Sequence, residues 1–248
     1  MPNFIFIDLP VASLWRAFNQ SDLMGQTIVV IQFIGSIFVW SLMLGKGREL
    51  KSTYNGCRAF LRDFLAGKDT MELYISQRRR AENSPFDVIY VKTCDRLVKL
   101  FDYATRVAVT GGRADEIKSA ALTARELTLV SGTTEHKLAE QIVRVEKGMS
   151  MLATATTAAP LVGLLGTVWG ILNAFQVVAD VGSAQLAEMA PSVSSAMLTT
   201  VVGLLVAIPS GIGYNILQSK VRSLVVDLEG FADELTGRIS CEFQGKGE

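Results

Sequence analysis

Two apolar stretches decide the fold of this chain. The first, at residues 151–178, reads MLATATTAAPLVGLLGTVWGILNAFQVV, and the second, at residues 191–218, reads PSVSSAMLTTVVGLLVAIPSGIGYNILQ. Neither stretch contains a charged residue, and each exceeds the roughly 20 residues with which an α-helix crosses about 30 Å of hydrocarbon. Since backbone amides in lipid must be satisfied within their own segment, the sequence predicts a hairpin of two membrane-spanning helices.

A third apolar segment lies nearer the N-terminus, at residues 26–45, with Trp40 near one end, where a membrane interface favours tryptophan. Hydrophobic residues make up 49% of the 248 residues and charged residues only 19%, and the mean hydropathy is +0.32. Soluble domains carry about a quarter charged residues. The sequence therefore predicts an all-α integral membrane protein with three transmembrane helices and a large helical insert after the first.

The distribution of charge sets the expected orientation. Residues 46–147 hold 19 lysines and arginines against 14 acidic residues, whereas residues 1–25 and 179–190 together hold one basic and four acidic residues. Because cytoplasmic segments carry the excess of lysine and arginine, we expect the insert inside the cell and the N-terminus outside. Three spans then place the C-terminal tail in the cytoplasm.

The expected segments alternate between polar and apolar character along the chain. Leu14, Trp15 and Phe18 beside charged residues give the first segment an amphipathic character typical of a membrane interface. The segments are a periplasmic N-terminus (1–25), the first span (26–45), a cytoplasmic helical region (46–147), the second span with its cytoplasmic approach (148–179), a periplasmic loop (180–190), the third span (191–218) and a cytoplasmic C-terminal helix and tail (219–248).

Helical periodicity is visible inside the insert and the tail. Apolar residues recur at helical spacing over residues 86–109, and the lack of proline after Arg113 predicts a long helix that runs directly into the second span. The Arg78-Arg79-Arg80 run is interpreted as a solvated loop. The tail is predicted to continue the third helix with an apolar side formed by Leu224, Leu228, Phe231 and Leu235.

No arrangement of residues is typical of an enzyme, a metal site or a nucleic-acid interface. Cys57, Cys94 and Cys241 are far apart in the sequence, and His136 lies in a charged helical stretch that favours a solvated position. The net charge is zero, which gives no electrostatic basis for binding nucleic acid. We therefore expect no catalytic residue, no metal and no cofactor.

Small residues recur at four-residue intervals in both later spans, and such spacing lets helix backbones approach closely. One helix pair cannot cover both sides of each span, so we predict a homo-oligomeric ring. Proline is tolerated in the first helical turn, where we place Pro191, and bends a helix elsewhere. The predicted packing residues are Pro160, Gly163, Gly166, Gly170, Pro191, Gly203, Ala207 and Gly211, with Gly166 and Gly203 at tight helix contacts.

Two motifs are specific enough to indicate a family. APLVGLLGTVWGI at residues 159–171 and APSVSSAMLTTVVGL at residues 190–204, followed by AIP at 207–209, closely resemble the ExbB/TolQ family, to which MotA is more distantly related. The resemblance implies a channel-forming subunit of a Gram-negative inner-membrane motor. It also implies a pentamer whose second and third spans line a central pore.

The resemblance implies partners and site residues as well. A single-span subunit of ExbD or TolR type would supply a transmembrane aspartate that carries the ion, and a TonB- or TolA-type protein would transmit force to the outer membrane. Thr167 and Thr200 match the pore-facing threonines of the family, and Ser195 and Thr199 belong to the same expected ion pathway. A non-conducting ring scaffold of the same fold and a Na⁺-driven, MotA-like stator subunit are the alternatives.

Ser195 departs from the family pattern, which usually has a glutamate at this position. A carboxylate buried in a membrane is expensive and normally functional. Its replacement leaves open Na⁺ selectivity, proton conduction through hydroxyls and water, or loss of conduction. Because the spans themselves contain no carboxylate, imidazole or amine, we predict that conduction needs the partner's aspartate.

Overall fold

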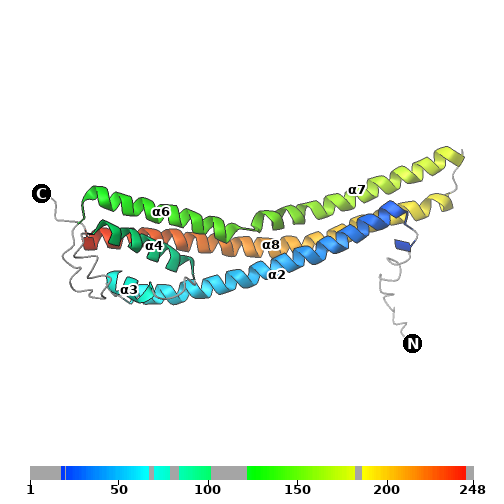
Figure 1. Cartoon of the computed structure of the whole chain (residues 1–248). Coiled ribbons are helices and arrows are strands. Elements are labelled where there is room, and N and C mark those ends of the chain that lie inside the picture. The colour runs from blue at the N-terminus through cyan, green and yellow to red at the C-terminus, as the bar shows by residue number, and fades with distance from the viewer. Residues whose placement is uncertain are drawn as a thin grey trace, which may run out of the picture. The chain divides into compact units, whose positions relative to one another are not determined.

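The computed structural model describes residues 18–19, 21–66, 70–78, 84–101, 122–181 and 186–243. Regular secondary structure in these ranges is helical, as Figure 1 shows. The helices are α2 (Leu23–Leu65), α3 (Thr70–Gln77), α4 (Pro85–Leu100), α6 (Ala124–Glu146), α7 (Met149–Val181) and α8 (Leu186–Phe243).

The described residues fall into two compact units. The first, the span unit, comprises those within residues 1–45 and 148–217, and the second, the insert unit, comprises those within 46–147 and 218–248. The division falls inside α2 and α8, so each of these helices contributes one part to each unit.

Three stretches of helix are long and apolar enough to cross a membrane. They lie within Leu23–Leu65, Ala124–Asp180 and Met189–Phe243, and the mean hydropathies of their most apolar segments are 2.2, 1.7 and 1.9. Many large apolar side chains on these helices are exposed, among them Phe33, Leu164 and Leu205 at 64%, 55% and 62%. The prediction of three membrane-spanning helices agrees with this finding.

The helix before the second span is interrupted, so the prediction of a continuous helix into that span is wrong. α6 ends at Glu146 and α7 starts at Met149. Gly148 between them has a φ of +87°, in the left-handed region that favours glycine. α4 also ends earlier than predicted, at Leu100, because the backbone of the next residue is extended.

The helix that contains the third span begins before Pro191, earlier than predicted. α8 starts at Leu186, which places Pro191 inside the helix rather than in its first turn. The residues before Pro191, LAEMA, are mostly good helix formers, which explains the earlier start. Pro160 in α7 and Pro209 in α8 also lie inside continuous helices. α8 extends to Phe243, which confirms that the tail continues the third helix.

Some predictions fall outside the described residues. These are the amphipathic segment at 1–17, the arginines at 79 and 80 and the region 102–121. His136, by contrast, lies on α6 and is exposed, as predicted.

Local sequence signals start two helices of the insert unit. Ser84 caps α4 by accepting a hydrogen bond from the backbone N–H of Asp87, and Pro85 takes the first helical position. Thr123 and Glu126 form a capping box at the start of α6.

An aromatic cluster forms the centre of the insert unit. Phe231 packs against Phe60, Phe64 and Phe86, with ring centroids 5.6, 5.1 and 4.7 Å apart, and Tyr90 packs against Phe60 at 5.4 Å. The predicted apolar side of the tail faces this interior. Its members Leu224, Leu228, Phe231 and Leu235 are all at most 3% exposed.

Candidate functional site

Glycines bring α7 and α8 into close contact in the span unit. A Cβ atom on Gly163 would lie 2.9 Å from the Thr199 carbonyl oxygen, and one on Gly170 would lie 2.6 Å from the Cβ of Ala196. A Cβ on Gly166 would collide with the side chain of Thr199. These three glycines therefore lie at close contacts between α7 and α8 of one chain, and their role in packing between copies stays a prediction.

Gly203 and Gly211 differ in their surroundings. A Cβ on Gly203 would lie 2.9 Å from the Ala159 carbonyl oxygen, whereas a Cβ on Gly211 would meet nothing within 4 Å. Ala207 is buried and Pro191 is exposed. A role for Gly211 or Pro191 in packing between copies of the chain stays a prediction.

Where α7 and α8 approach, three threonines gather around one carbonyl group. The Gly163 carbonyl oxygen lies 3.1 Å from Thr199 Oγ1, 3.0 Å from Thr200 Oγ1 and 3.4 Å from Thr167 Oγ1. The hydroxyls of Thr167 and Thr200 also hydrogen-bond each other. We call this group, Gly163 with the three threonines, the threonine cluster. Because glycine has no side chain, the nearby glycines leave room for these hydroxyls to reach across the helix interface.

The four predicted pathway residues occupy two environments. Thr199 and Ser195 are 1% and 3% exposed, so both lie buried among the chain's own helices. Thr167 and Thr200 are half-buried at the edge of the α7–α8 contact. Of these four residues, Thr167 and Thr200 are therefore the two that are partly exposed.

A carboxylate lies at the end of the span unit near Ser195. Asp22 precedes α2, accepts a hydrogen bond from the Gly25 N–H at 2.9 Å and accepts another from Asn173 Nδ2 at 2.5 Å. A Cβ on Gly25 would lie 3.0 Å from Asp22 Oδ1 and 3.5 Å from Ser195 Oγ. Asp22 therefore ties the start of α2 to α7, a role for which Asp, as a common helix N-cap, is suited.

Gln32 is a polar residue of the first span that the sequence reasoning did not single out. It is 5% exposed, and its Nε2 donates to the Ala159 carbonyl oxygen at 3.5 Å. The sequence does contain a signal for this residue, because a glutamine in the middle of an apolar span is rare and costly. Reasoning that searched the spans only for titratable groups passed over it.

The chemistry that the threonine cluster and Gln32 offer is hydrogen bonding. Hydroxyls and amides donate and accept hydrogen bonds or lend oxygen atoms to a cation, but they do not bind a proton near neutral pH. Among the described residues, no group of three or more His, Cys, Asp or Glu side chains has a geometry that could hold a metal ion.

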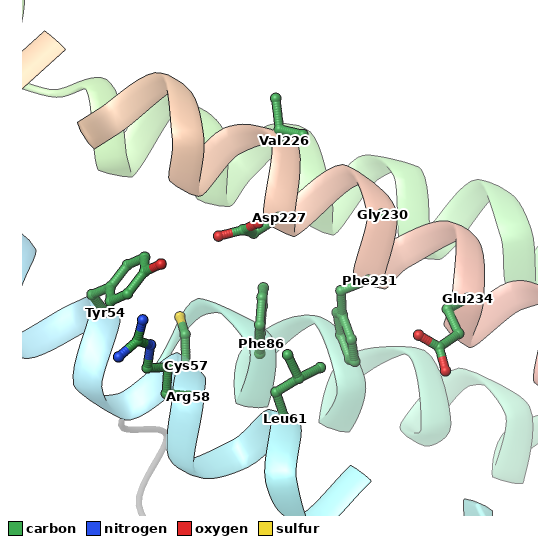
Figure 2. A pocket seen from close by; sticks show the side chains of 10 residues that line it. All are labelled: Tyr54, Cys57, Arg58, Leu61, Phe86, Val226, Asp227, Gly230, Phe231 and Glu234. Atoms are coloured by element: carbon green, nitrogen blue, oxygen red, sulfur yellow. The ribbon is translucent and has the colours of Figure 1, made fainter. Parts of the chain in front are cut away.

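The insert unit contains a cavity of about 380 Å³, shown in Figure 2. Its lining combines Phe86 and Phe231 with the charged residues Arg58 and Asp227. Cys57 also lines it, and burial raises the pKa of this thiol to about 11, so the thiol stays protonated and unreactive at neutral pH. The cavity therefore offers no activated nucleophile.

Residues 113–230 match the model of the MotA/TolQ/ExbB proton channel family. The chain resembles that family over just under half of its length. The matched residues include α6, α7 and all of the threonine cluster, whereas Asp22 and Gln32 lie outside them.

Proteins named TolQ and ExbB are similar to this chain over most of its length. The Tol-Pal system protein TolQ of Haemophilus influenzae is 28% identical over 233 residues, which are 92% of this chain and 94% of that protein. The biopolymer transport protein ExbB of Neisseria meningitidis is 28% identical over 230 residues, 92% of this chain and 97% of that protein. The ExbB of Pseudomonas putida is 27% identical over 210 residues, 84% and 58% of the two chains.

Proposed function

We propose that this chain is the ion-conducting, ring-forming subunit of an inner-membrane motor of ExbB–ExbD or TolQ–TolR type. Such a motor couples ion-motive force to mechanical work on a TonB- or TolA-like protein, for transport across the outer membrane or for its integrity. The observation that carries the proposal is the half-buried Thr167–Thr200 pair, which presents hydroxyls at the edge of two charge-free spans. The match of residues 113–230 to the model of a proton channel family supports it.

The proposed assembly is a homo-oligomer, five-fold by resemblance, in the inner membrane of a Gram-negative bacterium. Its insert and C-terminal tail lie in the cytoplasm, and its N-terminus lies in the periplasm. The exposed apolar side chains on α7 and α8, such as Leu161 and Ile208 at 64% and 60%, then face lipid or neighbouring copies. The protein acts as a channel and not as an enzyme.

The ion carrier in this proposal comes from a partner. α7 has no charged residue between Lys147 and Asp180, and α8 has none between Glu188 and Lys220. A single-span partner of ExbD or TolR type would place an aspartate beside the Thr167–Thr200 pair. Desolvation raises the proton affinity of such a carboxylate, so it takes up a proton from one side and releases it to the other.

The test is ion flux in vesicles that contain this chain with and without its partner subunit. We expect no flux from the chain alone and clear flux with the partner. Thr167→Val together with Thr200→Val should abolish that flux and leave the ring intact. Thr154→Val is a matched control, because Thr154 is exposed on α7 and its hydroxyl bonds only to the Ser150 carbonyl oxygen. Robust flux from the chain alone, or from the double valine variant with partner, contradicts the mechanism.

A non-conducting ring scaffold is the second candidate, and Ser195 is the observation that favours it. This residue is 3% exposed and carries no charge into the span unit. A scaffold would form the same ring with its partner but give no flux of H⁺ or Na⁺. Measuring flux of both ions in the same vesicles also separates a proton channel from a Na⁺-driven subunit.

A further inference from the structure

One side of α2 is buried along the first span. Gly25, Ile28 and Val39 lie on this side, and all are buried. Their spacings of three and eleven residues place them on one face of a helix. Ile31 and Phe33, on the other side, are 56% and 64% exposed. Gln32 belongs to the buried side, at a position where an aliphatic residue would normally pack.

The carboxamide of Gln32 lies where α2, α7 and α8 meet. Its Nε2 would lie 3.3 Å from a Cβ on Gly163 and 2.9 Å from a Cβ on Gly203, so the two glycines leave the space that it fills. Nε2 donates to the carbonyl oxygen of Ala159, the residue before Pro160. Oε1 is buried and has no hydrogen-bond partner among the residues that the structure describes.

Stability does not account for this residue. A buried polar atom without a partner costs about 1–3 kcal/mol, and one interhelical hydrogen bond in a membrane contributes only about 0.6 kcal/mol on average. A leucine of similar volume would fill the same space without an unpaired oxygen. The amide must therefore contribute something other than net stability.

We propose that Gln32 is a positioning residue for the threonine cluster. Its N–H group holds the Ala159 carbonyl, and so fixes the α7 turn that carries Gly163. The Gly163 carbonyl is thereby kept within reach of Thr199 and Thr200, and the Thr167–Thr200 pair keeps its orientation at the edge of the contact. This inference rests on the proposed ion conduction, because it assigns Gln32 a part in that function.

Few charged or titratable groups lie near Gln32. On α2 the nearest charged residues along the chain are Asp22 and Lys46, and α7 has none between Lys147 and Asp180. On α8 only the phenol of Tyr214 is titratable between Glu188 and Lys220. A change in pH near neutrality therefore leaves the wild-type contact unaltered.

The absence of such groups makes Gln32→Glu a sensitive probe. Protonated, the new carboxyl has the shape of the amide and an O–H that donates to the Ala159 carbonyl. Ionised, it has no donor and repels that carbonyl. Flux relative to wild type at each pH should be near normal at low pH and fall at least tenfold as pH rises, with a melting temperature that falls in parallel.

Gln32→Leu separates positioning from structural support. We expect flux with the partner to fall at least tenfold while the melting temperature stays the same or rises. Gln26→Leu is the matched control, because Gln26 is a glutamine of the same helix whose Nε2 donates to the carbonyl oxygens of Phe18 and Ser21 and not to α7 or α8 among the described residues. It should conduct like wild type.

Two results would overturn the inference. One is normal flux in Gln32→Leu, and the other is a lower melting temperature in that variant with no pH dependence in Gln32→Glu. Failure of the proposed function looks different, because the wild-type complex itself would then show no flux. The pH dependence of the Gln32→Glu melting temperature still tests the contact in that case.

Discussion

The span unit and the insert unit bury different kinds of side chain. Close contacts in the span unit are made by glycines and threonines, as at Gly166 and Thr199. The insert unit buries large aromatic and aliphatic side chains, such as Phe64 and Leu228, which are fully buried. In water, burial of apolar surface stabilises a fold by about 25 cal/mol per Å². Lipid is as apolar as leucine, so this driving force is lost between helices in a membrane, and close packing of helix backbones stabilises their contact instead.

This difference predicts that the largest loss of stability comes from truncating the aromatic cluster. Phe231→Ala removes a ring that contacts Phe60, Phe64 and Phe86 and should cost about 3–5 kcal/mol. The melting temperature of the purified full chain, followed by circular dichroism, measures it. Val226→Ala is the control on the same helix, since Val226 is 59% exposed. Equal effects of the two changes would contradict the assignment of the cluster as the core.

The converse change, adding a side chain, should be harmful in the span unit. In Gly166→Ala the new methyl group collides with Thr199, and overpacking of this kind costs about 1–3 kcal/mol. Gly132→Ala in α6 is the control, because nothing lies within 4 Å of the added carbon there. Since alanine favours helices, that control should be neutral or stabilising by up to about 1 kcal/mol.

Pairing Gly166→Ala with a second change sharpens the same test. Thr199→Ala removes the hydroxyl and methyl groups that the added carbon meets, so the double variant should regain part of the lost stability. Additive losses in the two variants would show that the two residues do not touch.

Threonine plays a smaller part in the insert unit. Thr93 Oγ1 lies 3.0 Å from Thr134 Oγ1, both are buried, and Thr134 also donates to the Val130 carbonyl oxygen at 3.1 Å. Thr134→Val leaves Thr93 without this partner and should cost about 1–3 kcal/mol. Thr93→Val should cost less, because Thr134 keeps its bond to Val130. The double variant should cost less than the sum, which a double-mutant cycle on melting curves measures.

Thiol reactivity reports the packing of the insert unit without altering its stability. Burial raises the pKa of Cys57 to about 11, so at pH 8 roughly one thiol in a thousand is ionised. Burial also raises the pKa of Cys94, whereas Cys241 is exposed. Iodoacetamide followed by mass spectrometry should label Cys241 first. Rapid labelling of Cys57 in the folded protein would contradict the packing around it.

The sequence by itself determined the three apolar spans, the helical class and the resemblance to a channel family. A long charge-free stretch in lipid is stable as a helix, because its backbone groups must bond within the segment. The helical spacing of apolar residues over Val221–Arg238 is also a property of that segment alone. The spacing of Gly166 and Gly170, and of Gly203 and Ala207, was also visible in the sequence, because small residues four apart favour close helix contacts. These properties depend on residues near one another along the chain.

Tertiary structure alone decided which groups meet across helices. The gathering of Thr167, Thr199 and Thr200 around Gly163, and the burial of Ser195, depend on how α2, α7 and α8 are rotated about their axes. Gln32 meets Ala159 across 127 residues of sequence. No local pattern encodes such a contact, because the side that a helix buries is set by the shape of its neighbours.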